Sequence, residues 1–378
     1  MLVTRTVPDV AELVALGREQ GLDAVGVASA EPFEGTRREL ERRKAAGLHG
    51  RMAFTYRSPE RSTTPDGTVP GARALVVGAR SYWRAQPPSP IDDGAPLAAV
   101  ARYAWSDHYA PLREALGAVA QRLVGHGWRA RVLADDNALV DRAAAHRAGL
   151  GWYGKNANLL LPGCGSWFVL GSVVTDAPLA DGAAPEAVPD GCGTCTRCIE
   201  ACPTGAIVAP GVVDARRCLA WLVQADGAFP QQHRVALGDR IYGCDDCQEV
   251  CPPNRRVART ANPPAVPGGS EAQVDVVDLL ASSDDELLAR HGRWYIPKRD
   301  PRYVRRNALV VLGNVGDPRD ARVVDAVRAA LTSTDPMLRA HAVWAARRMG
   351  LAALLTLVEG DPAAVVQDEL AAPVEVRD

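Results

Sequence analysis

The chain has 378 residues, of which 47% are hydrophobic and 23% are charged, so it can bury a substantial core. Its 43 Lys and Arg residues against 45 Asp and Glu residues give a formal net charge of −2, which excludes a uniformly basic nucleic-acid-binding protein. No apolar run approaches the roughly 18 residues of a membrane span, and the first residues lack the layout of a secretory signal. The sequence therefore predicts a cytoplasmic protein of two or three domains.

The first 185 residues alternate between helical and strand-like patterns. Apolar residues at helical spacing predict helices over residues 8–20, 112–125 and 141–148. Short apolar runs predict strands over residues 24–28, 74–79, 130–134 and 167–175. Because this alternation favours a sheet covered by helices, residues 1–185 are expected to form an α/β domain.

Two segments rich in proline or small residues, 176–191 and 252–269, are predicted linkers around a cysteine-rich domain at 186–260. The remaining residues, 270–378, have helical periodicity. Residues 304–312 and 338–346 resemble each other about 34 positions apart, and Asp-Pro precedes each of them; a weaker copy begins at Asp361. This period favours HEAT-like helical repeats, with chance similarity between helices as the alternative.

Eight of the nine cysteines lie between Cys192 and Cys251, which points to metal binding rather than disulfides in a chain without an export signal. The first run comprises Cys192, Cys195, Cys198 and Cys202, followed by proline. This is the spacing of bacterial ferredoxins, in which three thiolates bind one [4Fe–4S] cluster and the fourth binds another. Zinc is the alternative, but zinc sites normally use paired Cys-x2-Cys knuckles.

The second cysteine run lacks the first cysteine of this motif, and the upstream Cys218 can supply it. Exchange of the fourth ligand between two such runs assigns all eight thiolates. Cluster one is expected to use Cys192, Cys195, Cys198 and Cys251, and cluster two to use Cys202, Cys218, Cys244 and Cys247. Cys164 is left over. Two adjacent clusters form an electron conduit, so a redox centre is expected elsewhere in the protein.

Residues 149–155 (GLGWYGK) match the glycine pattern of a dinucleotide-binding loop. In such a loop the glycines follow a strand and open a helix, whereas here a predicted helix precedes them. Gly149 is therefore expected to end that helix in the left-handed conformation. The pattern does not favour a nicotinamide cofactor.

Several motifs, in order along most of the chain, resemble those of the epoxyqueuosine reductase family. They are DDNALVDR (135–142), AGLGWYGKNANLL (148–160), GSWFVLG (165–171), both cysteine runs, IPKR (296–299) and RNALVVLGN (306–314). The resemblance implies a cobalamin-dependent oxidoreductase, related to reductive dehalogenases, that reduces epoxyqueuosine to queuosine at the wobble position of tRNA anticodons. It implies an α+β multidomain fold with an N-terminal α/β cobalamin-binding domain, a ferredoxin-like module with two clusters and C-terminal HEAT-like repeats that bind tRNA.

The resemblance also implies roles for single residues. Asp135 aligns with the family's proton donor, while Asp136 stands where the family usually has a small or hydroxyl residue. Contacts to the corrin are expected from Arg61, Asp135, Lys155, Asn156, Asn158, Asp245 and Asp246. Considered without the family, Asp135 could be a solvated loop residue and Arg61 a surface arginine. Next to an apolar corrin, desolvation would raise the pKa of the Asp135 carboxyl and keep it protonated.

Basic residues are concentrated between Arg290 and Arg306, where Trp294 and Tyr295 interleave with them. Because cations bind phosphates and aromatic rings stack on unpaired bases, this stretch is the expected tRNA-binding region. The predicted contacts are Lys298, Arg299, Arg302, Arg305 and Arg306. A solvated helix face is the alternative.

Two rival functions remain open for the whole chain. One is a cobalamin-dependent reductase of a small molecule, such as a dehalogenase, which would need neither the basic stretch nor the repeats. The other is an electron-transfer ferredoxin with an appended binding module, which would bind no corrin. For the reductase, we expect a monomer, no membrane association and an unidentified low-potential electron donor.

Overall fold

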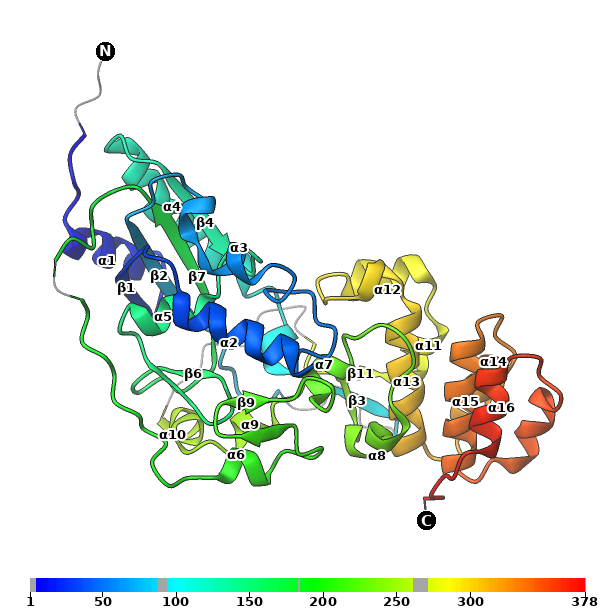
Figure 1. The fold of residues 1–378 in the computed structure, drawn as a ribbon. Helices are drawn as coiled ribbons and strands as arrows, with labels where there is room; N and C mark the ends of the chain where they lie inside the picture. Colours follow the sequence, from blue (N-terminus) through cyan, green and yellow to red (C-terminus); the bar gives the residue numbers. More distant parts are fainter. Residues whose placement is uncertain (1–4, 88–93, 183, 261–270, 378) are drawn as a thin grey trace. The chain divides into compact units, whose positions relative to one another are not determined.

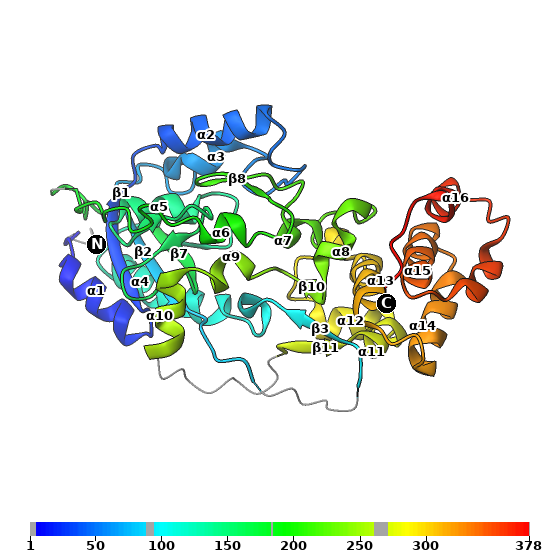
Figure 2. The ribbon, with the colours of Figure 1, turned by 90° about the horizontal axis from the view of Figure 1, so that it is seen from below.

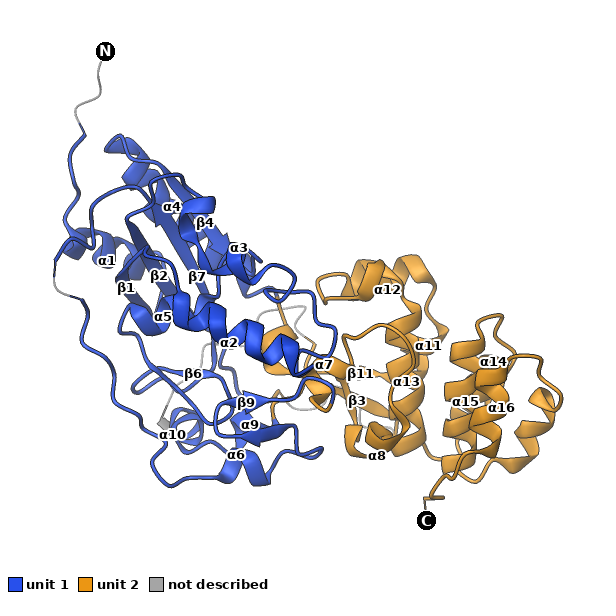
Figure 3. Ribbon diagram, in the orientation of Figure 1, with its two compact units in different colours: residues 1–85, 107–216, 246–265 blue, residues 86–106, 217–245, 266–378 orange. Residues whose placement is uncertain are grey.

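The computed structural model describes residues 5–87, 94–182, 184–260 and 271–377. The chain divides into two compact units, each assembled from three segments (Figure 3). Unit 1 contains residues 1–85, 107–216 and 246–265, and unit 2 contains residues 86–106, 217–245 and 266–378. The cysteine-rich segment contributes to both units, so this division differs from the three consecutive domains expected from the sequence. Among the described residues, no helix is long and apolar enough to cross a membrane.

Unit 1 is built on a four-stranded antiparallel sheet with the order β1-β2-β7-β4 (Figure 1). The strands are β1 (Ala24–Ser29), β2 (Ala74–Ser81), β4 (Ala130–Ala134) and β7 (Phe168–Thr175). The two central strands are almost entirely buried, as continuous apolar runs require when both faces of a sheet are covered. All four strands were predicted, with boundaries that differ by at most a few residues.

Helices pack on both faces of this sheet. They are α1 (Val10–Glu19), α4 (Tyr109–Gly125) and α5 (Asp141–Arg147), and all three were predicted. Gly78 and Gly171 pair across β2 and β7, and a Cβ atom at either position would meet the Leu116 side chain of α4. The absence of side chains there lets α4 approach the sheet closely. On the other face, α5 packs its alanines against Leu75, Val77 and Leu170.

The rest of unit 1 consists of short elements. They are α2 (Glu34–Ala45), α3 (Pro59–Thr63), a 3-10 turn (Pro65–Gly67), β5 (Trp152–Tyr153), β6 (Leu159–Leu160), α6 (Arg197–Glu200), β8 (Ile207–Ala209), β9 (Val212–Val213), α9 (Asp246–Glu249) and α10 (Pro252–Thr260). The predicted linker at 252–269 was wrong in its first half, because α10 begins there. Pro252 and Pro253 fit the first helical turn, where a missing N–H costs nothing. Residues 261–269 of that linker lie outside the described residues.

Unit 2 combines a small sheet with packed helices (Figure 2). In the sheet, β3 (Leu97–Val100) lies between the parallel β10 (Arg240–Tyr242) and the antiparallel β11 (Gln273–Asp275). The other elements are 3-10 turns at Arg102–Ala104, Gln231–His233, Pro297–Arg299 and Ala352–Val358, and helices α7 (Leu219–Leu222), α8 (Arg234–Leu237), α11 (Val276–Ala281), α12 (Asp284–His291), α13 (Arg302–Val315), α14 (Ala321–Leu331), α15 (Pro336–Arg348) and α16 (Ala364–Ala371).

The predicted helical repeats correspond to α13 and α15, which pack against each other. Asp-Pro has a physical role at the start of each copy, because the aspartate accepts a backbone N–H of the first turn. Asp300 accepts from Arg302 at 3.1 Å, and Asp335 accepts from Met337 at 2.8 Å. Before the shorter α16, Asp361 accepts from the Ala363 N–H at 2.9 Å. In the weak third copy, the aspartate therefore bonds to the residue that precedes the helix and not to its first turn.

Candidate functional site

The first cysteine run forms a tight loop that leads into α6 in unit 1. The Cys195 N–H donates to the Cys192 carbonyl at 2.9 Å, and the Cys192 N–H donates to the Asp190 carboxylate at 2.9 Å. Burial raises the pKa of the Cys198 thiol, and the neighbouring thiols of Cys192 and Cys195 raise it further. A hollow of about 630 Å³, lined by residues 190–197 and Pro252, opens over this loop.

Cys251 lies next to the same three cysteines. Burial raises the pKa of its thiol to about 11, and the thiols of Cys192, Cys198 and Cys195 contribute to that rise. No group of three or more His, Cys, Asp or Glu side chains within the described ranges is arranged around a single metal ion. The fit of these four cysteines to a cluster rests on their proximity: each thiolate disfavours ionisation of the others, and bound iron would relieve this effect.

The remaining cysteines of the motif are divided between the units. Cys202 and Cys247 belong to unit 1, whereas Cys218 and Cys244 belong to unit 2, so their grouping around a second cluster stays a prediction. The Cys202 sulfur accepts the Ala206 N–H at 3.1 Å. Such N–H···S bonds stabilise thiolates and raise the potentials of the clusters that they ligate. All nine cysteines are thiols rather than disulfides.

The glycine-rich segment after α5 forms the β5–β6 hairpin. Gly149 has a φ of +69° and donates its N–H to the His146 carbonyl at 3.1 Å, which confirms its predicted role at the end of a helix. A Cβ atom at Gly151 or Gly154 would overlap Leu160 of β6. These glycines therefore allow close packing within the hairpin, and they do not open a helix as dinucleotide binding requires.

The turn of this hairpin contacts both cysteine runs through predicted corrin-binding residues. The Lys155 Nζ donates to the Gly193 carbonyl at 2.7 Å, and the Asn156 Nδ2 donates to the Cys247 carbonyl at 3.3 Å. The Asn158 N–H donates to the Asn156 Oδ1 at 3.2 Å. These contacts were not foreseen, and contacts of the three residues with a corrin stay a prediction.

Asp135 follows directly after β4 and has a left-handed backbone with a φ of +56°. Aspartate tolerates this conformation better than most residues, and here it turns the chain away from the edge of the sheet. Asp135 is exposed, whereas the neighbouring Asp136 carboxylate accepts the Ala138 N–H at 2.8 Å. The Asp136 carboxylate thus stabilises the loop.

A network that the sequence did not indicate holds this loop against α3. The Ser62 hydroxyl donates to the Asn137 carbonyl at 2.7 Å, and the Asn137 Oδ1 accepts the Thr55 N–H at 3.2 Å. The Val140 N–H donates to the Ser62 carbonyl at 3.1 Å. Ser62 is only 2% exposed. The adjacent Arg61 is exposed on α3, on the segment that contacts the Asp135 loop.

Two carboxyl groups around this loop, those of Asp135 and Asp141, have raised pKa values. Desolvation raises the pKa of Asp135 and Asp136 raises it further, although the Arg113 guanidinium opposes them. Asp141, at the start of α5, has its pKa raised well above the ordinary value by burial and by Asp135. Its Oδ1 atom is shielded from solvent and has no hydrogen-bond partner. Burial and these two aspartates also raise the pKa of Tyr109.

The last two predicted corrin contacts lie where the chain passes between the units. Asp245 belongs to unit 2, where its carboxylate accepts the Arg102 N–H at 2.8 Å and lies 3.8 Å from the Arg102 guanidinium. Asp246 begins α9 in unit 1. Asp245 is thus engaged by Arg102, and a corrin contact from either aspartate stays a prediction.

The predicted tRNA-binding stretch separates into exposed and buried residues. Lys298 and Arg299 are exposed and have φ angles of +54° and +55°, which form a strained turn after Pro297. Arg302 is also exposed and is paired with Asp300 at 2.5 Å. Arg305 is half-buried and is paired with Asp284 at 2.5 Å.

Arg306 corrects the prediction, because it is fully buried in unit 2 and cannot contact RNA directly. Its guanidinium donates to the carbonyls of Ala225 and Gly227 at 2.7 and 2.6 Å, so it fixes the chain that follows α7. Trp294 is buried as well and stacks on Tyr242 and His291, whereas Tyr295 is 56% exposed. The charge and aromatic content of the stretch did not show which of its residues are buried and which are exposed.

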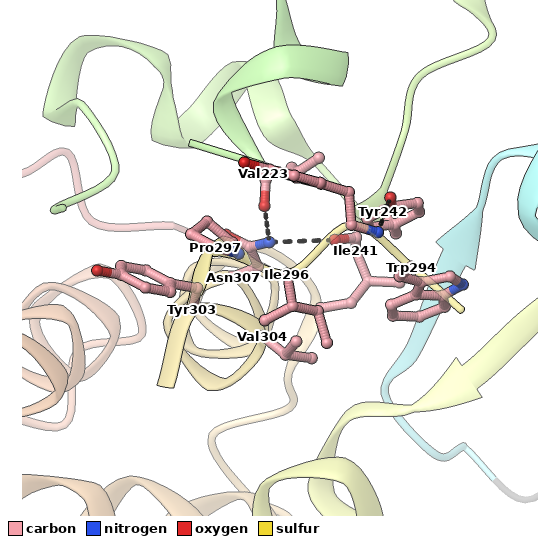
Figure 4. A pocket seen from close by; sticks show the side chains of 10 residues that line it. Val223, Ile241, Tyr242, Trp294, Ile296, Pro297, Tyr303, Val304 and Asn307 are labelled. Carbon is pink, nitrogen blue, oxygen red and sulfur yellow. Dashed lines mark hydrogen bonds between the residues drawn. The ribbon is translucent and has the colours of Figure 1, made fainter. Parts of the chain in front are cut away.

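Figure 4 shows the small cavity that lies behind the strained turn in unit 2. It is lined by Val223, Ile241, Tyr242, Trp294, Tyr295, Ile296, Pro297, Tyr303, Val304 and Asn307. The Asn307 amide donates to the carbonyls of Val223 and Ile241 at 2.8 and 3.4 Å. The volume is about 10 Å³, which is room for a water molecule and not for a substrate. This cavity therefore belongs to the packing that supports the turn.

Comparisons with known proteins match this arrangement. Residues 191–254 match a family described as a 4Fe-4S double cluster binding domain, and residues 295–372 match HEAT repeats. An epoxyqueuosine reductase of Xanthomonas campestris pv. campestris is 36% identical over 349 residues, covering 90% of this chain and 96% of that protein. The Bacillus cereus epoxyqueuosine reductase is 30% identical over 343 residues, covering 90% and 88%. The chain belongs to the epoxyqueuosine reductase family.

Solved structures of epoxyqueuosine reductases have the same fold. One contains a tRNA-Tyr epoxyqueuosine-modified stem loop; it is 28% identical, with a TM-score of 0.84, and the match covers 95% of this chain and 96% of that one. The Bacillus subtilis enzyme, described with its catalytic aspartate loop swung out of the active site, gives the same values. The predicted fold class is confirmed, and the chain is an oxidoreductase that reduces epoxyqueuosine.

Proposed function

We propose that the chain reduces epoxyqueuosine to queuosine in the anticodon of tRNA and that Asp135 supplies a proton to the leaving oxygen. The observation that carries this proposal is Asp135, an exposed residue whose carboxyl pKa is raised and whose loop is held by Ser62. A raised pKa suits a general acid, because the carboxyl keeps its proton to a higher pH. The solved relatives with a tRNA stem loop and with a named catalytic aspartate loop support this assignment.

The reaction consumes two electrons and two protons, because the epoxide becomes an alkene and its oxygen leaves as water. The oxygen is a poor leaving group unless it is protonated as the carbon–oxygen bonds break. Asp135 is the proposed source of this proton, since desolvation and Asp136 raise the pKa of its carboxyl against the opposing effect of Arg113. The Asp136 carboxylate instead accepts the Ala138 N–H, which occupies it in holding the loop.

Cobalamin is the cofactor that we propose for unit 1. When bound, it would supply the low-potential electrons that remove the epoxide oxygen. The donors that would hold it are the exposed Arg61 beside the Asp135 loop and the polar turn of the β5–β6 hairpin with Lys155, Asn156 and Asn158. Ammonium and amide groups suit the amide-rich rim of a corrin. Asp245 and Asp246 complete the proposed set.

Two [4Fe–4S] clusters would deliver these electrons. We assign Cys192, Cys195, Cys198 and Cys251 to the first and Cys202, Cys218, Cys244 and Cys247 to the second. The crowding of the first four thiols and the match to a double-cluster domain support this assignment. Anaerobic analysis should give about eight iron and eight sulfide per chain, with no change in Cys164→Ser. Stoichiometric zinc instead would contradict the assignment.

The anticodon stem loop would contact the exposed turn of unit 2 that carries Tyr295, Lys298, Arg299 and Arg302. Arg305 is a peripheral candidate, because it is half-buried and paired with Asp284, whereas Arg302 is exposed although it is paired with Asp300. This basic surface favours a tRNA substrate over a small molecule, which would not require it. With tRNA as substrate, we infer that the enzyme works in the cytoplasm, as a monomer supplied by a low-potential electron donor.

The decisive experiment compares Asp135→Asn with Asp136→Asn. Conversion of epoxyqueuosine-containing tRNA is measured with a strong chemical reductant, so that no physiological donor is needed. Asp135→Asn should lose turnover by on the order of 10²–10⁴ while binding cobalamin and tRNA normally, as loss of a positioned acid predicts. Asp136→Asn should lose much less. Near wild-type turnover of Asp135→Asn would overturn the proposal.

A further inference from the structure

The turn between β5 and β6 makes side-chain contacts with both cysteine runs within unit 1. Lys155 donates from its Nζ to the carbonyl of Gly193 at 2.7 Å, and Gly193 lies between Cys192 and Cys195. Asn156 donates from its amide to the carbonyl of Cys247 at 3.3 Å. Two adjacent residues of one turn thus bind the backbone at Gly193 and at Cys247, which are far apart in the sequence.

The turn itself is rigid. Asn156 is only 6% exposed, and its Oδ1 accepts the Asn158 N–H at 3.2 Å, which closes the turn on itself. The Lys155 carbonyl accepts the Gly211 N–H at 2.9 Å, and the Gly211 carbonyl accepts from the Arg43 guanidinium at 2.9 Å. The ammonium group of Lys155 is therefore presented from a fixed backbone rather than from a mobile loop.

We propose that Lys155 and Asn156 are positioning residues for the iron–sulfur clusters: Lys155 fixes the Cys192–Cys195 loop and places a positive charge beside the first cluster, and Asn156 fixes the backbone of Cys247. This inference rests on the proposed binding of two clusters. It gives the two residues a task that does not depend on contact with a corrin.

The charge of Lys155 has a definite electrostatic consequence. A reduced cluster carries one more negative charge than the oxidised cluster, so a nearby cation stabilises the reduced form and raises the reduction potential. Loss of the charge should therefore lower the equilibrium constant for reduction roughly 3- to 30-fold, as expected for one charge near a site that solvent partly screens.

The test is an EPR-monitored redox titration of the reconstituted holoprotein, with iron content measured for each variant. Lys155→Met removes both the charge and the hydrogen bond, Lys155→Gln removes the charge and keeps a donor, and Lys155→Arg keeps both. We expect the first cluster of the Met and Gln variants to be harder to reduce by the factor given above. The Arg variant should restore the wild-type potential, and the second cluster should not change.

Asn156 is tested by the rate of iron loss to a chelator. Asn156→Ala should release iron several-fold faster than wild type, because the backbone of Cys247 loses its support. Asn158→Ala is the matched control, since Asn158 contributes its backbone N–H to the turn and this variant keeps it. An equal rate in the wild type and in Asn156→Ala would overturn the role of Asn156.

Other results would overturn either the role of Lys155 or the proposed function. Unchanged potentials in both Lys155→Met and Lys155→Gln would overturn the role of Lys155, and a loss of cobalamin affinity without a change of potential would make it a corrin ligand instead. Failure of the wild-type protein to bind about eight iron atoms would contradict the proposed function itself. Iron content therefore separates the two failures.

Discussion

The Ser62 hydroxyl donates a hydrogen bond to the backbone carbonyl of Asn137 at 2.7 Å, two residues after Asp135 in the chain. Through this bond, α3 holds the loop that carries Asp135, the acid that we propose. In the Bacillus subtilis relative, the catalytic aspartate loop is described as swung out of the active site.

Ser62→Ala should therefore reduce turnover while leaving iron content unchanged. Loss of the bond leaves the Asn137 carbonyl without its partner, at a cost of about 1–3 kcal/mol to the observed loop position. Turnover at saturating tRNA should fall about tenfold. Ser58→Ala is the control, because Ser58 is exposed and its side chain caps no helix. Equal turnover in both variants would show that Ser62 does not hold the loop.

The pH dependence of the reaction should report on Asp135. Its pKa is raised, so the proton-donating form persists above the ordinary range of aspartate and is lost as the pH rises through that pKa. Turnover should fall on this alkaline side. Asp136→Asn removes a neighbouring negative charge and should shift the fall to lower pH, whereas Arg113→Met removes a positive charge and should shift it to higher pH. Single-turnover rates across pH measure both shifts, and shifts in the same direction would contradict the assignment.

Asp141 should make the folded protein less stable as the pH rises. Its folded-state pKa lies well above its unfolded value, so its contribution to stability is complete below the unfolded pKa and is lost as the pH rises through the folded pKa. Asp141→Asn abolishes this loss. The melting temperature of the variant should therefore exceed that of the wild type by more at pH 8 than at pH 5.

Asp317→Asn is the control of opposite sign. Hydrogen bonds from Arg319 lower the pKa of the Asp317 carboxyl, so its contribution is present above the ordinary aspartate pKa and is lost as the pH falls. Asp317→Asn should gain no stability at pH 8. If both variants gained equally, the buried carboxyl of Asp141 would not be the cause.

Arg306 and Lys298 should behave differently although both belong to the basic stretch. Arg306→Met leaves the carbonyls of Ala225 and Gly227 unsatisfied in the core and should destabilise unit 2 by about 3–5 kcal/mol. Lys298→Asn should leave the melting temperature unchanged, since asparagine tolerates the left-handed backbone.

For Lys298→Asn, tRNA binding is the measurement. The variant should bind tRNA more weakly, and the slope of log affinity against log salt should fall in magnitude by about one, as expected for one lost phosphate contact. Unchanged affinity and slope would remove Lys298 from the tRNA surface. The pair of variants separates a structural arginine from a binding lysine.

The strands of unit 1 were predictable because their apolar runs are longer than a surface loop tolerates. α2 was missed because eight of the twelve residues of Glu34–Ala45 are charged and only Leu40 is buried, so no apolar stripe marks it. Its polar face is instead stabilised by the pairs of Glu39 with Arg42 at 2.7 Å and with Arg43 at 2.6 Å, which lower the pKa of Glu39 to about 2.

Among the functional residues, too, local motifs were predictable from the sequence and contacts between distant segments were not. The spacing of the cysteines contains enough information to propose their ligand sets, because the motif is local. The contacts of Ser62 with Asn137 and of Lys155 with Gly193 join segments far apart in the sequence, and no local pattern marks them. Arg306 was misassigned because its charge is visible in the sequence and its burial is not.

Gly171, in the central strand β7, packs closely against the residues that precede the proposed acid, Asp135. A methyl group at this position would lie 3.0 Å from the Ala134 Cβ and 3.0 Å from the Leu133 carbonyl oxygen, immediately before Asp135, and would also meet Leu116 of α4. The first turn of α4 carries Tyr109, whose charge environment includes Asp135. Inactivating substitutions found by random mutagenesis should therefore recur in β7, in variants that fold and retain their cofactors but misplace the acid.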